Sequence, residues 1–213
     1  MSRTRLMAII GAVAGLAALV LQFALMFFSM TSEGVSPLAV VWRYLGYFTI
    51  LTNAFIAIVW TRAALQDEDQ PRLEGAGAVS IVMTGVIYHL MLASRWNPQG
   101  LQLLADFIHH TFTPIWFALY WLIRPHGALK WADAAIFVIW PLSYCAYALT
   151  RGALDGWYAY YFLDPTRTTL PMLALSIAVQ SAAFLACALV LVGIDKALGR
   201  MRAASSASVA ARP

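Results

Sequence analysis

Six long apolar runs constrain the fold of this chain more than any other feature. A bilayer core is about 30 Å thick, and a helix of roughly 20 apolar residues crosses it. The sequence contains six runs near that length, which we interpret as transmembrane helices. They span approximately residues 6–29, 38–60, 76–93, 103–123, 134–149 and 170–194. The pattern therefore predicts an all-α polytopic membrane protein, a six-transmembrane-helix bundle.

The composition agrees with this prediction. Of the 213 residues, 62% are hydrophobic and only 11% are charged, and the mean hydropathy is +0.72. These values exclude a soluble globule of ordinary composition. The short alternating segments of a β-barrel do not occur. The first run follows Arg3 and Arg5, as in a signal peptide, but it is too long and lacks a small-x-small cleavage site, so we expect a retained anchor helix.

The basic residues predict the orientation. If the N-terminus is cytoplasmic, ten of the fourteen Lys and Arg residues lie on that side: Arg3, Arg5, Arg62, Arg72, Arg124, Lys130, Lys196, Arg200, Arg202 and Arg212. Positive residues favour the cytoplasmic face, so we expect both termini there. The net charge of +4 then reflects this bias and attraction to anionic lipids, and it does not imply nucleic acid. We expect a single membrane domain at 1–195 and a basic, disordered cytoplasmic tail at 196–213.

The stretch 106–114, DFIHHTFTP, is unusually polar for a membrane span. Ionisable groups at membrane depth are costly and suggest a functional site. Because Pro114 has no N–H, we expect a kink at which the carbonyl of His110 loses its helical partner. Asp106 and His110 share a helix face with Thr113, so Asp106 can accept from one ring nitrogen of His110 while the other points away.

The second apolar run supplies a hydroxyl group. Its segment 42–53, WRYLGYFTILTN, places Thr49 and Asn53 on one polar stripe with Thr52 beside it. A lone threonine in such a helix usually bonds a backbone carbonyl of its own preceding turn, but three polar side chains exceed that need. At ~1.5 Å per residue, Thr49 and His110 lie roughly 18 and 12 Å from the outer ends of their helices. The two side chains can therefore meet in the outer half of the membrane.

Other polar and aromatic residues surround these two segments. His89 lies near the outer end of its helix, either as a hydrogen-bonded strut or as a ligand. The stretch 151–165, RGALDGWYAYYFLDP, fits either an interfacial aromatic belt or a lid over an amphiphile whose arginines meet a carboxylate or phosphate. The candidate substrate-binding or supporting residues are Thr52, Asn53, His89, His109, Thr113, Trp157, Tyr158, Tyr161 and Arg151.

Three segments, FTILTN, DFIHHTFTP and RG…GWYAYYFLD, resemble the bacterial Pr-six-Pr membrane-protein family, six-helix proteins of mostly unassigned function. More distantly, the chain is similar to the androgen-induced and androgen-dependent membrane proteins, intramembrane threonine hydrolases that cleave fatty-acid esters of hydroxy fatty acids. Thr49 matches their nucleophile and His110 matches their histidine. Phe107 and Thr52 depart from that pattern, since the hydrolases have His and Asp there. The resemblance implies a bacterial cytoplasmic (inner) membrane protein. The predicted orientation and the depths of Thr49 and His110 place the site toward the non-cytoplasmic side.

These observations support two functional hypotheses. In the first, the protein is an intramembrane threonine hydrolase of a membrane lipid or fatty-acyl ester. Thr49 is the nucleophile, His110 the general base oriented by Asp106, and Asn53 the oxyanion donor. In the alternative, the protein is a non-catalytic lipid-binding or transport membrane protein whose polar pocket holds a head group.

Cofactor chemistry has little support in the sequence. The motifs GxGxxG, HExxH and CxxC and the P-loop do not occur. A metal or haem site would have to use His89, His109, His110 and Asp106. Adjacent histidines on a helix point about 100° apart and rarely bind one ion. We therefore expect no metal and no cofactor.

Overall fold

The computed structural model describes residues 1–66 and 68–210, and within these ranges the chain is helical with no strand. The helices are α1 (Arg3–Ser32), α2 (Pro37–Tyr44), α3 (Phe48–Gln66), α4 (Pro71–Ile87), α5 (Gly100–Phe107), α6 (Thr113–Ile123), α7 (Asp133–Phe137), α8 (Ile139–Asp155) and α9 (Leu170–Ala210), with π-helical turns η1 (Tyr88–Leu92) and η3 (Ile108–Phe112) and 3₁₀ turns η2 (Ala93–Arg95) and η4 (Tyr161–Leu163). The expected all-α class is confirmed.

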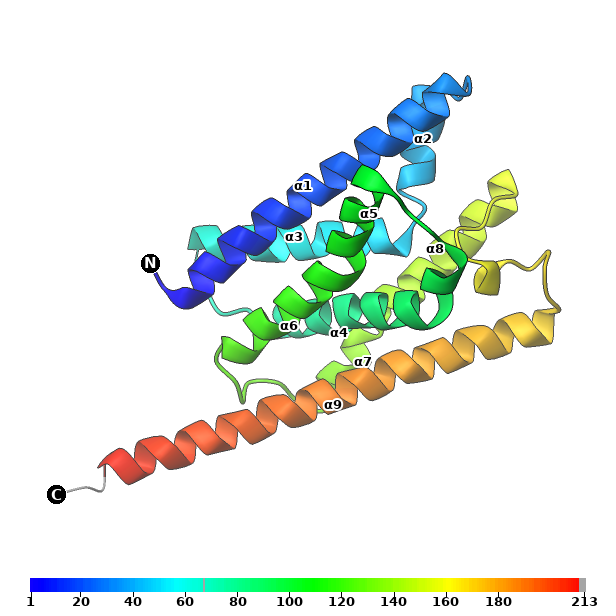
Figure 1. Ribbon diagram of the computed structural model, residues 1–213. Coiled ribbons are helices and arrows are strands. Elements are labelled where there is room, and N and C mark those ends of the chain that lie inside the picture. Colours follow the sequence, from blue (N-terminus) through cyan, green and yellow to red (C-terminus); the bar gives the residue numbers. More distant parts are fainter. Residues whose placement is uncertain (67, 211–213) are drawn as a thin grey trace.

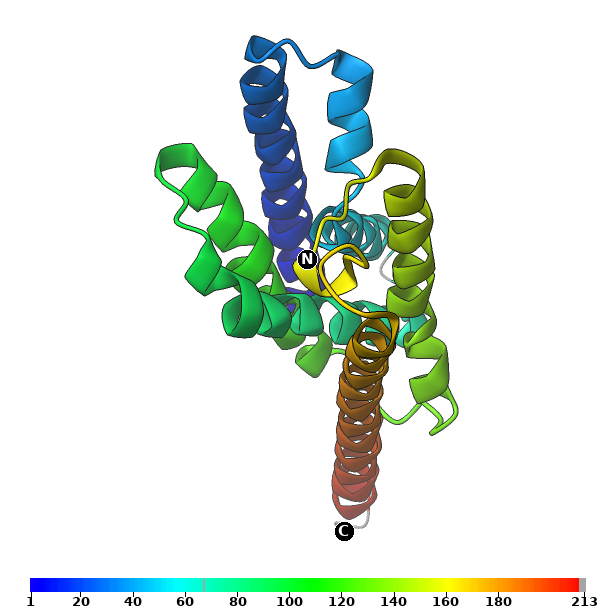
Figure 2. The same cartoon turned by 90° about the vertical axis from the view of Figure 1, so that its right-hand side faces the viewer.

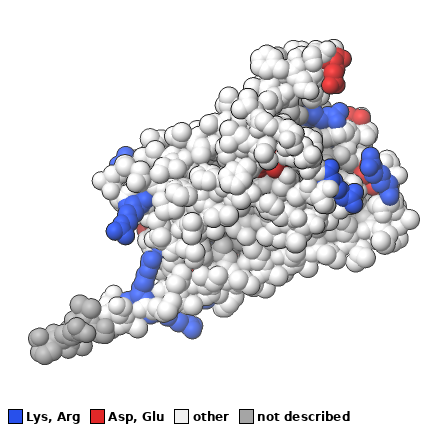
Figure 3. All heavy atoms as spheres, viewed as in Figure 1, with Lys and Arg blue, Asp and Glu red and all other residues white. Residues whose placement is uncertain are grey.

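Five helical stretches of the described chain are long and apolar enough to cross a membrane. They are Arg3–Ser32, Phe48–Gln66, Pro71–Arg95, Asp133–Asp155 and Leu170–Ser206. The remaining predicted span, 103–123, corresponds to α5, η3 and α6, which carry the polar stretch 106–114. In Figure 3 charged side chains gather toward the two ends of the visible face and leave a broad, largely uncharged belt between them. This distribution is consistent with an integral membrane protein.

Two predicted helices are interrupted. The second apolar run divides into α2 and α3 at residues 45–47, and the fifth divides into α7 and α8 at Val138, three residues before Pro141. The expected disordered tail also differs, because α9 continues through Ala210, while residues 211–213 lie outside the described part. Alanine and arginine favour helix, and Arg202 Nη1 donates to the Arg124 carbonyl at 2.9 Å.

Helix α4 lies at the centre of the bundle. It packs against α3, α6 and α9, and its buried glycines allow large side chains from neighbouring helices to come close to its backbone. Helices α1 and α9 lie on opposite sides of the bundle (Figures 1 and 2), and both chain termini lie at the same end (left in Figure 1). The segment 156–169 crosses the opposite end, seen face-on in Figure 2.

Buried ion pairs and hydrogen bonds to a carboxylate connect the helices and loops at the end of the bundle where the termini lie. Buried Arg124 contacts Glu74 at 2.9 Å and Asp69 at 2.8 Å. Asp69 belongs to the loop between α3 and α4, and the neighbouring Asp67 lies outside the described residues. Buried Asp195 of α9 accepts from the backbone N–H groups of residues 127 and 129, each at 3.0 Å. These contacts fix α9 to the loops at this end.

Small residues of α1 allow close packing on α3. The buried positions of α1 are Ala8, Gly11, Ala12, Gly15 and Ala18, which form one stripe along the helix. The fully buried ring of Trp60 lies against Gly11. These small residues therefore allow the close α1–α3 contact.

Gly11→Ala is expected to weaken the α1–α3 contact, because an added Cβ would lie 2.6 Å from the Trp60 ring. Overpacking of this kind costs about 1–3 kcal/mol, so the thermal unfolding midpoint in detergent should fall. Gly15→Ala is the matched control, since its Cβ would meet the same ring at an ordinary 3.8 Å. Equal midpoints for the two variants would contradict this packing.

Candidate active site

The interruption between α2 and α3 determines where Thr49 lies. Thr49 is the second residue of α3, so it sits in the first turn and not in mid-helix. An added Cβ at Gly46, inside the interruption, would lie 2.5 Å from Trp157 and 2.6 Å from Arg151. Glycine therefore permits these side chains to approach the backbone at the point where the helix stops.

Side chains on one face of α8 satisfy the carbonyl groups freed by this interruption. Tyr144 donates to the Gly46 carbonyl at 2.8 Å, Tyr147 to the Leu45 carbonyl at 3.1 Å, and Arg151 Nη2 to the Trp42 carbonyl at 2.5 Å. An unpaired carbonyl in an apolar interior is costly, so these bonds stabilise the break. Helix α8 thereby fixes the position at which α3, and with it Thr49, begins.

A second irregularity positions the histidines. The N–H of Thr113 bonds to the Ile108 carbonyl, five residues back, which is the π-helical register. In that register the carbonyl of His109 would pair with Pro114, which has no N–H. Asn53 Nδ2 instead donates to the His109 carbonyl at 3.4 Å. The backbone is therefore irregular where we expect a kink, and the carbonyl that Asn53 supports there is that of His109.

The three candidate catalytic side chains form a chain of hydrogen-bonding contacts from Thr49 through His110 to Asp106. Thr49 Oγ1 is 3.2 Å from His110 Nε2. His110 Nδ1 is 3.2 Å from Asp106 Oδ1 and 3.1 Å from the Asp106 carbonyl. The acceptors at Nδ1 favour a proton on that nitrogen, which leaves Nε2 free to accept the proton of Thr49. The arrangement has the geometry of a nucleophile, a base and an orienting carboxylate.

Tyr88 is a further member of this group, which the sequence analysis did not single out. Its hydroxyl donates to Asp106 Oδ2 at 2.6 Å, and its ring stacks on His110 with centroids 3.7 Å apart and planes 9° apart. Tyr88 begins η1, so the stacked rings come from two facing π-helical turns. Such turns are frequent at functional sites. The neighbouring His89 is a candidate from the sequence because an ionisable side chain is unusual in a membrane span. A single tyrosine there is not unusual.

Tyr160 lies on the other side of Thr49. Its hydroxyl is 3.5 Å from Thr49 Oγ1 and accepts from the Thr49 backbone N–H at 3.4 Å. Tyr160 is buried in the aromatic stretch 157–162, so the sequence indicated the segment but selected the neighbouring tyrosines. Only the tertiary structure shows which ring faces the hydroxyl of Thr49.

A cavity of about 500 Å³ lies beside this group. Thr49, Asp106, His109 and His110 line it together with Tyr88 and Tyr160. The remaining wall comes from α1 and from the segments near the end opposite the termini, and it includes Gln22, Leu25, Met26, Met30, Arg95, Trp96 and Gln102. The cavity thus combines polar groups with an aliphatic wall, as a site for an amphiphile requires.

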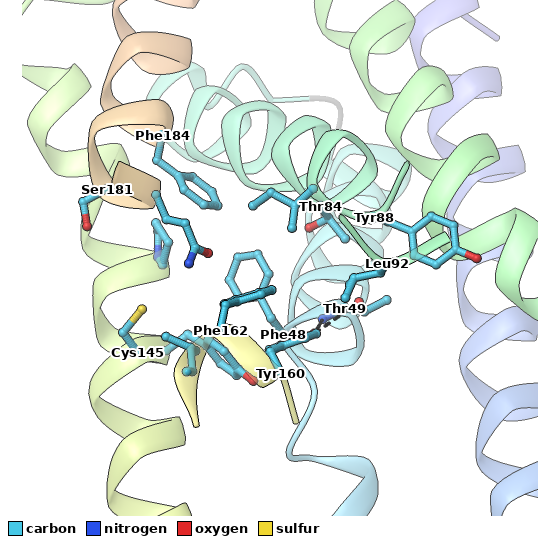
Figure 4. Close-up of a pocket in the computed structure, with 15 residues that line it drawn as sticks. Phe48, Thr49, Thr84, Tyr88, Leu92, Cys145, Tyr160, Phe162, Ser181 and Phe184 are labelled. Atoms are coloured by element: carbon cyan, nitrogen blue, oxygen red, sulfur yellow. Dashed lines mark hydrogen bonds between the residues drawn. The ribbon is translucent and has the colours of Figure 1, made fainter. Parts of the chain in front are cut away.

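A second, smaller cavity of about 50 Å³ lies on another side of Thr49. Its lining is almost entirely apolar and includes Phe48, Phe162 and Phe184. Figure 4 shows Thr49 on one side of this cavity and Ser181 on the other, with the hydroxyl of Tyr88 pointing away from it. Thr49 therefore stands between a large cavity with a mixed polar and apolar lining and a small, mainly apolar one.

Several predicted residues have structural contacts instead of lining the large cavity. Thr52 accepts from Trp140 Nε1 at 3.1 Å, which links α3 to α8. His89 Nε2 is 3.1 Å from Thr111 Oγ1, in a separate open groove. Asn53 donates to the carbonyls of Thr49 and His109, so its amide nitrogen does not serve the oxyanion role that we expect from the sequence.

The expected lid residues also hold the fold together. Arg151 is buried and stacks on Trp42, with its guanidinium carbon 4.0 Å from the ring centroid. Trp157 packs against Tyr47 and Tyr158 against the backbone of Gly152. Tyr161 lies under the guanidinium of Arg95, 4.3 Å from its ring centroid. Of the segment 157–162, Ala159 and Tyr160 reach the wall of the large cavity.

Asp164 anchors the end of this segment. Its Oδ1 accepts from the backbone N–H and hydroxyl of Thr166, and its Oδ2 is 3.0 Å from Arg167 Nε. Burial raises the pKa of the Asp164 carboxyl, but these hydrogen bonds and the charge of Arg167 outweigh it and hold the pKa below its ordinary value. The carboxylate is therefore ionised at neutral pH, and it holds the turn before α9.

No protein-family model, curated protein or solved structure matches this chain. Among residues 1–66 and 68–210, no three His, Cys, Asp or Glu side chains are grouped so that they could hold a metal ion. The likeness to the Pr-six-Pr and androgen-related proteins remains a resemblance of short segments. The functional argument therefore depends on the geometry around Thr49.

Tyr144→Phe is expected to destabilise the protein, because it leaves the buried Gly46 carbonyl without its donor. The loss should be about 1–3 kcal/mol in the free energy of unfolding, measured by denaturation in detergent. Thr150→Val is the control on the same helix, since its exposed hydroxyl bonds to the Ala146 carbonyl of α8 itself. A loss in Thr150→Val as large as in Tyr144→Phe would contradict this account of the interruption.

Proposed function

We propose that this protein is an intramembrane threonine hydrolase that cleaves a lipid or fatty-acyl ester. The observation that carries the proposal is the contact of 3.2 Å between Thr49 Oγ1 and His110 Nε2, with Asp106 at the opposite ring nitrogen. A threonine hydroxyl is a weak nucleophile at neutral pH, so it needs a base within hydrogen-bonding distance. The cavity of about 500 Å³ provides space for a substrate beside both groups.

In the acylation step, His110 Nε2 takes the proton of Thr49 as Oγ1 attacks the ester carbonyl. Asp106 stabilises the resulting imidazolium, and the bond from Tyr88 holds the carboxylate in place. The imidazolium then gives its proton to the departing alcohol, which leaves an acyl group on Thr49. Water hydrolyses this ester in the second step.

Tyr160 is the oxyanion donor in this proposal. Its hydroxyl is 3.5 Å from Thr49 Oγ1, so it lies within reach of an oxygen on the carbon that Oγ1 attacks. The backbone N–H of Thr49, in the first turn of α3, lies beside it. N–H groups of a first turn have no partner inside the helix, and donors that face the developing charge are a large part of acyl-transfer catalysis.

The proposed membrane arrangement has six spans, with α5, η3 and α6 forming one of them. Both termini face the cytoplasm, as the basic residues indicate, and the membrane is the bacterial inner membrane, as the resemblance implies. Arg95, Trp96 and Ala159 line the cavity, and the segment 156–169, which includes Ala159, crosses the end opposite the termini. The site then opens toward the non-cytoplasmic side.

The cavity wall supports a lipid substrate. Leu25, Met26 and Met30 of α1 face the cavity, and the smaller apolar cavity adjoins Thr49. Arg95 at the opening can pair with an anionic group of an amphiphile. These features favour an ester with an aliphatic chain and a polar end.

Thr49→Ala and His110→Ala should each lower kcat by about 10³-fold or more for a fluorogenic acyl ester. Thr52→Val is the matched control, because Thr52 lies in the same helix but bonds to Trp140. A fluorophosphonate probe should label the unaltered protein at Thr49. Retained turnover in Thr49→Ala would contradict the mechanism, and co-purified lipid without turnover or labelling would favour the lipid-binding alternative.

Tyr160→Phe should lower kcat by about 10²-fold, because the oxyanion loses a donor. KM should change little, since the hydroxyl acts mainly in the transition state. Steady-state kinetics in detergent micelles would separate the two constants. A change in KM alone would show that Tyr160 contributes to substrate binding and not to the transition state.

A further inference from the structure

Buried polar atoms without a hydrogen-bonding partner gather behind the catalytic group. Three neighbouring residues contribute such atoms here: Asn53 with Oδ1, Thr113 with Oγ1 and His109 with its ring, of which one nitrogen has only the Ala18 backbone nearby. The other buried unpaired atoms of the described residues belong to Trp60, Ser80 and Arg151. Asn53, His109 and Thr113 are only 1%, 2% and 1% exposed. Burial of an unpaired polar atom costs free energy. A group of such atoms close together therefore favours a bound ligand that forms hydrogen bonds with them.

The three residues adjoin one another. Asn53 Nδ2 reaches the carbonyl of His109 at 3.4 Å, which places the amide of α3 against the π-helical turn η3. Thr113 follows His109 by four residues, about one turn along the same helical stretch. The backbone of Ala18 in α1 lies close to the His109 ring. The polar cluster therefore lies between α1, α3 and the start of α6.

His109 connects this cluster to the candidate active site. It lines the cavity of about 500 Å³ that Thr49 and His110 also line, whereas Asn53 and Thr113 lie behind the cavity wall. A lipid head group in the cavity can touch His109 but cannot extend to the other two side chains. The ligand of the whole cluster must therefore be small.

Water has the required chemistry. Neutral histidine offers one donor and one acceptor, the amide oxygen of Asn53 accepts, and the hydroxyl of Thr113 does both. A buried water typically forms about three hydrogen bonds with groups of this kind. An anion or a metal cation would bring an uncompensated charge to a position that has no charged side chain of its own.

We propose that Asn53, His109 and Thr113 form a buried hydration site that supplies the water for deacylation. This inference rests on the proposed hydrolase function. The water oxygen forms a bond to the acyl carbon on Thr49, and His110 Nε2 takes one of its protons. The bond from that carbon to Oγ1 then breaks, and the proton passes to Oγ1, which restores the threonine hydroxyl and releases the carboxylic acid.

The membrane environment explains why the reaction needs a water site inside the protein. During turnover an acyl chain occupies a cavity whose α1 wall is formed by Leu25, Met26 and Met30, and bulk water has poor access to a group buried among lipids. A hydration site on the protein side of the acyl-enzyme provides the second substrate independently of the cavity opening.

The test separates acylation from deacylation with an activated p-nitrophenyl acyl ester. His109→Phe and Thr113→Val remove polar atoms of the cluster. Thr61→Val and Thr150→Val are controls with the same threonine substitution, because these two hydroxyls bond to carbonyls of their own helices and neither residue lines a cavity beside Thr49. Using two sites in the cluster keeps the test valid if His109→Phe fails to fold.

For both cluster variants we expect the steady-state rate to fall about tenfold more than the burst of p-nitrophenol, with accumulation of acyl-Thr49 detected by mass spectrometry. His109→Asn, which retains a donor and an acceptor, should recover part of the steady-state rate. Added hydroxylamine, a nucleophile that can replace water, should restore release of the acyl group. The control variants should behave like the unaltered protein.

Unchanged deacylation in both cluster variants, with normal Thr49-dependent turnover, would overturn the hydration site alone. A burst that falls in parallel with the steady-state rate would do the same, because it would indicate a general structural role. Absence of Thr49-dependent turnover in the unaltered protein would overturn the hydrolase proposal as well, so the two failures are distinguishable.

Discussion

The architecture of the candidate site depends on one constraint: backbone groups freed inside an apolar bundle must find hydrogen-bonding partners. The chain stops being regular helix at residues 45–47 and again at Ile108–Phe112. At the first place tyrosine hydroxyls and a guanidinium of α8 bond to the freed carbonyls, and at the second the amide of Asn53 does so. Side chains of other helices thus stabilise each irregularity.

The two irregularities together bring the reactive groups into contact. The interruption before α3 places Thr49 in a first turn, where its backbone N–H has no helical partner and its hydroxyl lies between Tyr160 and His110. The π-helical turn directs His110 toward Thr49 while Asp106 still reaches its other nitrogen. A regular α2–α3 helix would place Thr49 in mid-helix, with its N–H already bonded. The two breaks in regular helix therefore bring the reactive side chains of Thr49, His110 and Asp106 together.

The contact of His110 with Asp106 was predictable because both groups lie one turn apart on the same helix. Helical rise allowed Thr49 and His110 to meet but did not predict their contact, since the depths counted from the outer ends of their helices were roughly 18 and 12 Å. Tyr88 and Tyr160 were not predictable as members of the site. A tyrosine in an apolar helix or an aromatic segment has the same local pattern whether its hydroxyl meets a catalytic group or a solvent-facing carbonyl.

The sequence by itself determined the helical class, the apolar stretches of membrane-spanning length and the small-residue surface of α1, because these depend on composition and on periodicity along one helix. It also determined that Pro114 would disturb its helix. Only the tertiary structure decided that Asn53 supports the backbone there and that Arg151 holds the α2–α3 interruption. These outcomes depend on how neighbouring helices approach one another, and the hydrogen-bonding demands of each break are met by residues far away in the chain.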